Sequence, residues 1–335
     1  MQKRHLGKSG PEVSALGLGC MAMSGMYGPS DRAESIATIH AALEAGVTLF
    51  DTGDFYGMGH NEMLLREALA NGRRENVFLC VKCGAQRAPD GSWVGVDARP
   101  ASVKNFLSYT LRRLGTSYVD LYQASRVDPS VPIEDTVGAI ADMVRAGYVR
   151  HIGLSEAGAE TIRRAHAVHS IAALQIEYSA MSREVEAEIL PTLRQLGISL
   201  VAYGVLSRGL LTGSGPASGT ASQGDLRRIF PRFQGENLEQ NRKLIEGLSR
   251  IAAGKGIGIA QLAFAWVLAR GNDVLPLAGA RTRTQLAAAL EALDVTLSPE
   301  ELALIDRLLP AGAVAGDRYP TPQMAHLDSE RRTTH

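Results

Sequence analysis

Residues 119–156 read VDLYQASRVDPSVPIEDTVGAIADMVRAGYVRHIGLSE, and this stretch contains the repeating unit of the chain. Its apolar start, residues 119–125, predicts a buried strand, and residues 132–146 have the apolar spacing of an amphipathic helix. Gly147 comes directly after that helix, where glycine adopts the left-handed conformation that ends it. A second strand-like run then begins at residue 148, so the stretch predicts a strand–helix–strand unit with parallel strands.

The same alternation continues through most of the chain. Gly46, Gly115 and Gly197 each separate a predicted helix from the next predicted strand. The strand-like runs are apolar on both faces, which is typical of a parallel sheet covered by helices. Eight units in about 300 residues favour a (β/α)8 barrel, with a doubly wound sheet as the alternative. The predicted strands lie within 13–21, 47–53, 77–84, 119–125, 148–156, 174–179, 198–206 and 274–280, and the helices that follow them lie near 31–45, 61–71, 99–114, 132–146, 158–169, 184–196, 237–253 and 282–293.

Several segments lie outside this repeat. Residues 4–14, with Gly-Lys-Ser-Gly-Pro at their centre, predict a β-hairpin that closes the N-terminal end of the barrel. The long Gly/Ser-rich connection 207–236 is typical of an active-site flap or a disordered segment. Residues 259–270 and 298–309 predict extra helices, and we expect the tail after Pro310 to be loosely held. We therefore expect a single domain over 1–335, with the barrel over about 13–293 and a C-terminal helix and tail over 294–335.

The charge balance argues against a nucleic-acid or membrane partner. Lysine plus arginine and aspartate plus glutamate number 35 each, so no net field attracts a polyanion or a membrane surface. The N-terminus has no basic and then apolar leader, and no apolar run reaches the roughly 18 residues of a membrane span. We expect a cytoplasmic protein that acts on a small molecule, and the sequence does not indicate its oligomeric state.

The three cysteines lie in apolar, strand-like contexts, at Cys20, Cys80 and Cys83. The spacing of Cys80 and Cys83 resembles half of a redox or zinc motif, but no second pair and no histidine cluster accompanies it. Along a strand these two positions point to opposite faces, which suits neither use. The sequence therefore predicts reduced core thiols and no metal site.

Polar residues gather at the carboxyl ends of the predicted strands, where (β/α)8 barrels hold their active sites. Asp51 and Lys82 lie in otherwise apolar strands, and because an unpaired buried charge is very unfavourable, we expect them to form a buried ion pair. Tyr56 follows Asp51 closely. An ammonium beside a phenol stabilises the phenolate, so we expect Lys82 to lower the pKa of Tyr56 and make it a general acid.

Seven motifs in this chain resemble those of the aldo-keto reductases and occur in the same order. They are LFDTGDFYGMGHNEMLLREAL, VKCG, SRVDP, GLSE, LQIEYS, YGVLSRGLLTG and LPLAGAR, and the resemblance covers about residues 5–310. It is strongest to the bacterial and plant branch of the family. The resemblance implies a (β/α)8 barrel that transfers hydride from NADPH to an aldehyde or ketone without a metal.

The resemblance also implies roles for single residues. Tyr56 is similar to the family's proton donor, and Asp51 and Lys82 are similar to the residues that support it. Ser155 and Gln175 are similar to the donors that hold the nicotinamide carboxamide. The other implied cofactor contacts are Met21, Asp51 and Tyr203, with the Tyr203 ring stacked on the nicotinamide. Along the pyrophosphate the resemblance implies Gly204, Leu206 and Arg208. Around the ribose 2′-phosphate it implies Gly279, Arg281, Thr282 and Gln285, which favours NADPH over NADH.

The chain departs from the family pattern at its fourth catalytic position, where Ser125 replaces a histidine. A hydroxyl can still donate one hydrogen bond to the carbonyl oxygen, but it is shorter and cannot be charged. Losing one such donor typically slows a reaction by about a hundredfold or more. We retain Ser125 as a catalytic residue, with a water, Gln123 or Arg126 as further candidate donors.

Two departures concern the cofactor. Glu156 replaces the usual asparagine or arginine after Ser155 and introduces a carboxylate near the nicotinamide end. Ala288 and Ala289 stand where a Glu-Asn pair commonly holds the adenine. Both changes weaken the expectation of tight NADPH binding.

Two functions therefore stay open. The first is an NADPH-dependent carbonyl reductase, acting on an aldehyde such as pyridoxal or on a bulkier ketone, or running in reverse on an alcohol. The second is an NADPH-binding regulatory or redox-sensing barrel with negligible turnover, motivated by Ser125. A metal-dependent barrel hydrolase or lyase is disfavoured because the sequence shows no His/Asp ligand set.

Overall fold

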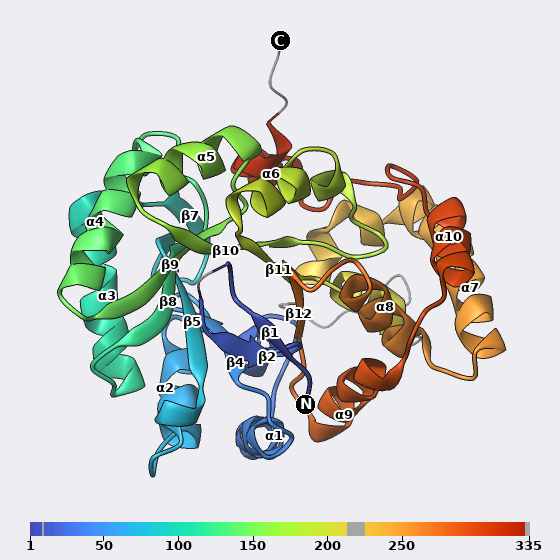
Figure 1. Ribbon diagram of the computed structural model, residues 1–335, viewed down its shortest axis with the longest axis horizontal. Coiled ribbons are helices and arrows are strands. Elements are labelled where there is room, and N and C mark those ends of the chain that lie inside the picture. The colour runs from blue at the N-terminus through green and yellow to red at the C-terminus, as the bar shows by residue number, and fades with distance from the viewer. Residues whose placement is uncertain (9, 213–224, 332–335) are drawn as a thin grey trace.

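The computed structural model describes residues 1–8, 10–212 and 225–331, in which eight parallel strands close into a barrel (Figure 1). Neighbouring strands follow the order β10-β11-β12-β3-β4-β5-β8-β9. The predicted (β/α)8 barrel is thus confirmed, and the doubly wound alternative is wrong. The barrel strands are β3 (Gly17–Gly19), β4 (Leu49–Gly53), β5 (Phe78–Cys83), β8 (Val119–Ala124), β9 (Val149–Ser155), β10 (Ile171–Glu177), β11 (Ser199–Tyr203) and β12 (Val274–Ala278).

Helices surround the barrel on its outer side (Figure 1). Two consecutive helices follow β11, and a further helix follows the last barrel unit, so both predicted extra helices are confirmed. The helices are α1 (Arg32–Glu44), α2 (His60–Ala68), α3 (Pro100–Leu114), α4 (Ile133–Arg145), α5 (Ala159–Val168), α6 (Ile189–Leu196), α7 (Gly235–Gly254), α8 (Ile259–Leu268), α9 (Arg283–Leu290) and α10 (Pro299–Leu308).

Local sequence fixes the ends of several helices. Helix α3 begins at Pro100, whose ring favours the first helical position, and ends at Gly115, which has a φ of 65°. Helix α10 begins with a capping box: Ser298 Oγ accepts from the Glu301 amide, and Glu301 accepts from the Ser298 amide at 2.7 Å. Gly115 thus ends α3 where the chain turns back into the barrel at β8, and the capping box fixes the start of α10.

The strands separate two apolar cores. A smaller cluster, with Leu49, Leu121 and Val201 among its members, fills the barrel interior, and a larger one lies between the strands and the helices. Cys80 belongs to the interior cluster and Cys83 to the outer one. Both thiols are free and buried, which confirms the prediction of core thiols.

Two hairpins decorate the barrel. The N-terminal one, β1 (Lys3–His5) paired with β2 (Glu12–Ser14), confirms the predicted cap, because its Val13 packs in the interior cluster. The second, β6 (Ala85–Arg87) paired with β7 (Trp93–Val96), was not predicted. Its strands are short and half-exposed, with an irregular register, so they lack a clear alternation of apolar and polar residues.

The expectation of a loosely held tail is wrong. Within residues 310–331, Arg318 and Leu327 are buried, and Arg318 contacts Glu156 and Glu177 at the carboxyl ends of β9 and β10. The Asp328 carboxylate accepts from the Gly158 amide at 2.8 Å, and the Ser329 amide donates to the Glu156 carbonyl at 3.1 Å. The tail is held by polar groups far away in the sequence, and its own composition gives no sign of them. The tail contains two short helical segments, α11 (Thr321–Met324) and η8 (Asp328–Glu330).

The connection between β11 and α7 is described only in part. Its ends form short turns at η4 (Ser207–Thr212), η5 (Leu226–Ile229) and η6 (Pro231–Phe233). The central residues of the predicted flap, 213–224, lie outside the described residues.

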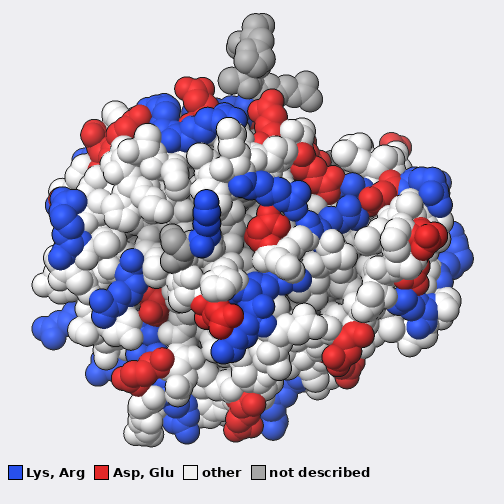
Figure 2. Space-filling view, in the orientation of Figure 1, with Lys and Arg blue, Asp and Glu red and all other residues white. Residues whose placement is uncertain are grey.

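The surface shows charges of both signs side by side (Figure 2), in keeping with the equal numbers of basic and acidic residues. Within the described ranges, no single helix is long and apolar enough to cross a membrane. Helices α7 and α8 pass that test only when taken together, and they meet at an angle of 88°. Helix α8 is a core helix whose face packs against β12.

Candidate active site

A buried ion pair lies at the carboxyl ends of the barrel strands. Lys82 Nζ on β5 donates to both oxygens of Asp51 on β4, at 2.6 and 2.7 Å. Gln175 Nε2 donates to Asp51 Oδ2 at 2.6 Å. Its strand, β10, is four strands away from β4 in either direction around the barrel, so Gln175 spans the interior. The predicted Asp51–Lys82 pair is present, and Gln175 completes the hydrogen bonding of its carboxylate.

Tyr56 lies beside this pair in the loop after β4, and its side chain is buried. Lys82 Nζ is 5.1 Å from the centroid of the Tyr56 ring. Burial raises the pKa of the Tyr56 phenol well above its ordinary value, and the nearby Asp51 carboxylate raises it further. The expected net lowering of the Tyr56 pKa is therefore wrong, because burial and the Asp51 charge outweigh any effect of Lys82. The phenol stays protonated through the neutral pH range, which is the form a proton donor needs.

Three unpaired polar side chains face the same region from β8 and β9. Gln123 and Ser125 alternate with Ala124, so they share the inward face with Leu121 of the interior cluster. The Gln123 amide and the hydroxyls of Ser125 and Ser155 are buried and have no hydrogen-bond partner among the described residues. A buried polar group without a partner costs about 1–3 kcal/mol. Such groups clustered beside Lys82 indicate a site for a polar ligand.

Glu156, directly after Ser155, is fully buried and adopts a φ of 53°. Its carboxylate accepts hydrogen bonds from Arg318 at 2.8 and 3.1 Å, from the Tyr203 hydroxyl at 2.6 Å and from Ser329 Oγ at 2.7 Å. Although burial opposes it, the Arg318 charge holds the pKa of Glu156 below its usual range. The carboxylate expected near the nicotinamide end is thus already neutralised by the C-terminal tail.

A second buried carboxylate, Glu177, lies at the end of β10. Arg208 donates to it at 2.7 Å, Arg318 approaches it at 3.4 Å and Arg232 at 3.6 Å. The Arg208 guanidinium also packs against the rings of Phe230 and Tyr319, at 4.5 Å from each centroid. Arg208 therefore holds the loop after β11, which contains Gly204 and Leu206, against the end of β10.

The loop before α9 forms a compact polar turn with the loop after β3. Arg281 donates from its guanidinium to the backbone carbonyls of Tyr27 at 3.2 Å and Pro29 at 3.0 Å. Its amide donates to Gln285 Oε1 at 3.0 Å, and Thr282 caps α9 by accepting from the Gln285 amide. Of the remaining predicted residues, Gly279 belongs to this loop and Met21 begins the turn η1 (Met21–Ser24) after β3.

The structure also identifies two residues that the sequence analysis missed. Arg318 and Tyr319, both in the tail, contact the ends of β9, β10 and β11. The signal that could have found them is the pair of carboxylates, Glu156 and Glu177, each at the end of an apolar strand and each requiring a cation.

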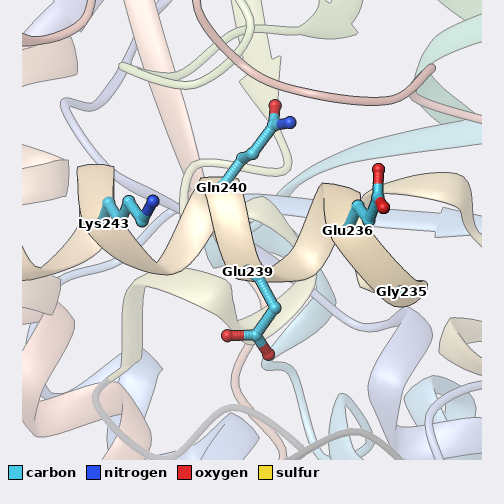
Figure 3. Close-up of a pocket in the computed structure, with 5 residues that line it drawn as sticks. All are labelled: Gly235, Glu236, Glu239, Gln240 and Lys243. Carbon is cyan, nitrogen blue, oxygen red and sulfur yellow. The ribbon is translucent and has the colours of Figure 1, made fainter.

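A surface hollow elsewhere has no comparable chemistry. It is lined by one helix, α7, through Gly235, Glu236, Glu239, Gln240 and Lys243. Figure 3 shows these side chains pointing in different directions rather than toward a common point. The carboxyl ends of the barrel strands, which we call the barrel mouth, are therefore the better candidate site.

Asp54 provides a pH test of the mouth. Burial, followed by the charge of Glu62, raises the pKa of Asp54 to about 7. A carboxyl group whose pKa is raised on folding stabilises the protein fully below its unfolded pKa, near 4, and loses that contribution as the pH rises. We therefore expect Asp54→Asn to gain stability relative to the parent chain between about pH 4 and pH 7, with a constant difference above.

The urea unfolding midpoints of Asp54→Asn and of the parent chain, compared at several pH values between pH 4 and 9, measure this difference in stability. Asp90→Asn is a suitable control, because Asp90 is exposed and its pKa is shifted downward. A difference between Asp54→Asn and the parent chain that does not change with pH would contradict the prediction.

Comparison with known proteins agrees with this geometry. The model of the Aldo/keto reductase family matches residues 15–310. A curated relative, "Probable aldo-keto reductase 1" of Glycine max, is 42% identical over 322 residues, covering 95% of this chain and 92% of the relative.

Solved structures with the same fold include glycerol dehydrogenase AKR11B4 of Gluconobacter oxydans, with a TM-score of 0.83, 27% identity and coverage of 99% of this chain and 98% of that one. The holo form of aldo-keto reductase AKR11C1 of Bacillus halodurans has a TM-score of 0.78 at 29% identity, covering 93% and 97%. A thermostable aldo-keto reductase in complex with the inhibitor epalrestat has a TM-score of 0.72 at 30% identity, covering 92% and 100%. With a family match over most of its length and a relative at this level of identity, the chain belongs to the aldo/keto reductase family.

Proposed function

We propose that this chain is an NADPH-dependent reductase that transfers hydride to the carbonyl carbon of an aldehyde or ketone, with Tyr56 donating the proton. The observation that carries the proposal is the buried phenol of Tyr56 beside the Lys82–Asp51 pair at the carboxyl ends of the strands. An ion pair alone would be an ordinary structural feature, whereas the phenol next to it supplies a proton donor. The family assignment supports the same reaction class.

Tyr56 serves as the general acid in this proposal. Its raised pKa keeps the phenol protonated at neutral pH. An alkoxide forming on the substrate is a much stronger base than a phenolate, so proton transfer from Tyr56 remains favourable. Lys82, held in place by Asp51, offers its positive charge to the phenolate as that charge develops.

The cofactor residues follow from the same proposal. Ser155 and Gln175 would hold the carboxamide of NADPH, and Tyr203 would stack on the nicotinamide ring. The buried, unpartnered hydroxyl of Ser155 fits this role, because a ligand group would satisfy it. NADPH, when bound, supplies the hydride. The set is completed by Met21 and Asp51, by the loop with Gly204, Leu206 and Arg208 at the pyrophosphate, and by Gly279, Arg281, Thr282 and Gln285 at the adenosine end.

NADPH is proposed over NADH because of Arg281. Arg281 directly precedes Thr282, the N-cap of α9, and its guanidinium donates to backbone carbonyls of the loop after β3. A guanidinium can bind a phosphate through two parallel hydrogen bonds, and a helix N-terminus also favours an anion. This combination suits the 2′-phosphate that distinguishes NADPH.

We propose that the reaction can run in either direction. A structural neighbour of the chain is named a glycerol dehydrogenase, which is an alcohol-oxidising activity. The same Tyr56 would then accept the proton of the alcohol, by microscopic reversibility.

Tyr56→Phe tests the proposal most simply. We expect it to lower kcat by about a hundredfold to ten-thousandfold, because it removes the proton donor and keeps the ring. NADPH affinity should change little. NADPH oxidation is followed at the nicotinamide absorbance band with a broad panel of aldehydes and ketones. If no carbonyl compound is reduced by the parent chain, so that Tyr56→Phe is equally inert, the proposal is wrong.

A regulatory barrel that binds NADPH with negligible turnover is the second candidate, favoured by Ser125 in place of a histidine. Ser125→His separates the two. If the chain is a reductase, a single-turnover experiment should show NADPH decay on addition of an aldehyde, and the histidine should speed it by about a hundredfold or more. Absence of decay in the parent chain, with tight NADPH binding, would favour the regulatory function.

A further inference from the structure

The tail contributes an arginine and a tyrosine to a buried polar cluster at the ends of three neighbouring strands. We call it the Arg318 cluster, and its members are Glu156, Glu177, Tyr203, Arg318 and Tyr319. Arg318 contacts both carboxylates of this cluster, at 2.8 Å for Glu156 and 3.4 Å for Glu177, and it also pairs with Glu330 of the tail at 2.6 Å. Its side chain is 5% exposed, and both carboxylates are fully buried.

Tyr203 is held in this cluster by its hydroxyl. The hydroxyl donates to Glu156 Oε1 at 2.6 Å and lies 2.8 Å from the hydroxyl of Tyr319. Both contacts are made by the hydroxyl oxygen, at the outer end of the side chain, so they fix the direction of the side chain and the position of its ring. The Tyr203 ring is therefore held in position by Glu156, directly after β9, and by Tyr319 of the tail, as well as by its own strand.

Arg318 in turn fixes Glu156. Two hydrogen bonds from Arg318 orient the carboxylate that accepts from Tyr203. A buried carboxylate that loses its cation is strongly disfavoured and will turn toward another donor or toward water. Docking of the tail, the position of Glu156 and the position of the Tyr203 ring are thus coupled.

We propose that Glu156 and Arg318 are positioning residues for the nicotinamide: they hold the Tyr203 ring in the position at which the cofactor stacks on it, and so couple tail docking to cofactor binding. This inference rests on the proposed function, in which Tyr203 contacts the nicotinamide. Coupling of this kind is reciprocal, so a bound cofactor should also stabilise the docked tail.

Three variants isolate this role. Arg318→Met removes the cation, Arg318→Lys keeps the charge without the paired hydrogen bonds, and Tyr203→Phe keeps the ring but loses the hydroxyl contacts. Arg331→Met is the matched control, because Arg331 lies in the same tail but is exposed and pairs only with Asp328 in the described part of the chain.

The first measurement is cofactor binding and the selectivity of hydride transfer. We expect Arg318→Met and Tyr203→Phe to weaken NADPH binding by about tenfold or more, with Arg318→Lys between them and the parent chain. NADPH that carries deuterium at one of the two C4 positions of the nicotinamide shows which hydrogen is transferred. Arg318→Met and Tyr203→Phe should transfer a larger fraction of the C4 hydrogen that the parent chain leaves on the cofactor. A merely structural role would not change that selectivity.

The second measurement is hydrogen exchange in residues 314–331. NADPH should slow exchange there in the parent chain and in Arg331→Met, and should slow it less in Tyr203→Phe. If Arg318→Met does not fold, Tyr203→Phe still decides the question.

Unchanged NADPH affinity and unchanged hydrogen selectivity in Tyr203→Phe would overturn the inference while leaving the proposed function intact. A parent chain that fails to bind NADPH would instead overturn the proposed function, and this inference with it. Binding by the parent chain is therefore measured first.

Discussion

The contact between Lys82 and Asp51 is the interaction on which the rest of the barrel mouth depends. It places two full charges inside an apolar barrel, and such charges are tolerated there only as a pair with further hydrogen bonds. Gln175 supplies one of those bonds from the opposite side of the barrel. The hydrogen bond from Gln175 therefore links the two sides of the mouth, and the pair keeps Lys82 beside the Tyr56 ring.

A second group of charges lies beside this pair and is supplied partly by the tail. Glu156 and Glu177 end neighbouring strands, and Arg208, Arg232 and Arg318 neutralise them from the loop after β11 and from the tail. Between the two groups of charges are the unpaired hydroxyls of Ser125 and Ser155. The mouth thus combines satisfied charges, which make it rigid, with unsatisfied polar groups, which are suited to a ligand.

The sequence predicts the features that depend on local pattern. Strand–helix alternation and the glycines after helices are enough for the barrel, and the position of Asp51 and Lys82 within apolar strands is enough for their pairing. The sequence does not predict contacts between residues that only the folded chain brings together. Arg318 is an ordinary charged residue in the sequence, and the raised pKa of Tyr56 reflects burial among groups from several strands. The β6–β7 hairpin was missed because its half-exposed strands have no regular pattern.

In the proposed reaction the Asp51–Lys82 pair serves both the structure and the proton transfer, and a double-mutant cycle tests this dual role. Lys82→Met alone should destabilise the chain by about 3–5 kcal/mol, because it leaves a buried carboxylate without its cation. Lys82→Met combined with Asp51→Asn should recover most of that stability, yet should not restore carbonyl reduction. A double variant that reduces carbonyl compounds as fast as the parent chain would show that the pair is only structural and would rule out its proposed role in proton transfer.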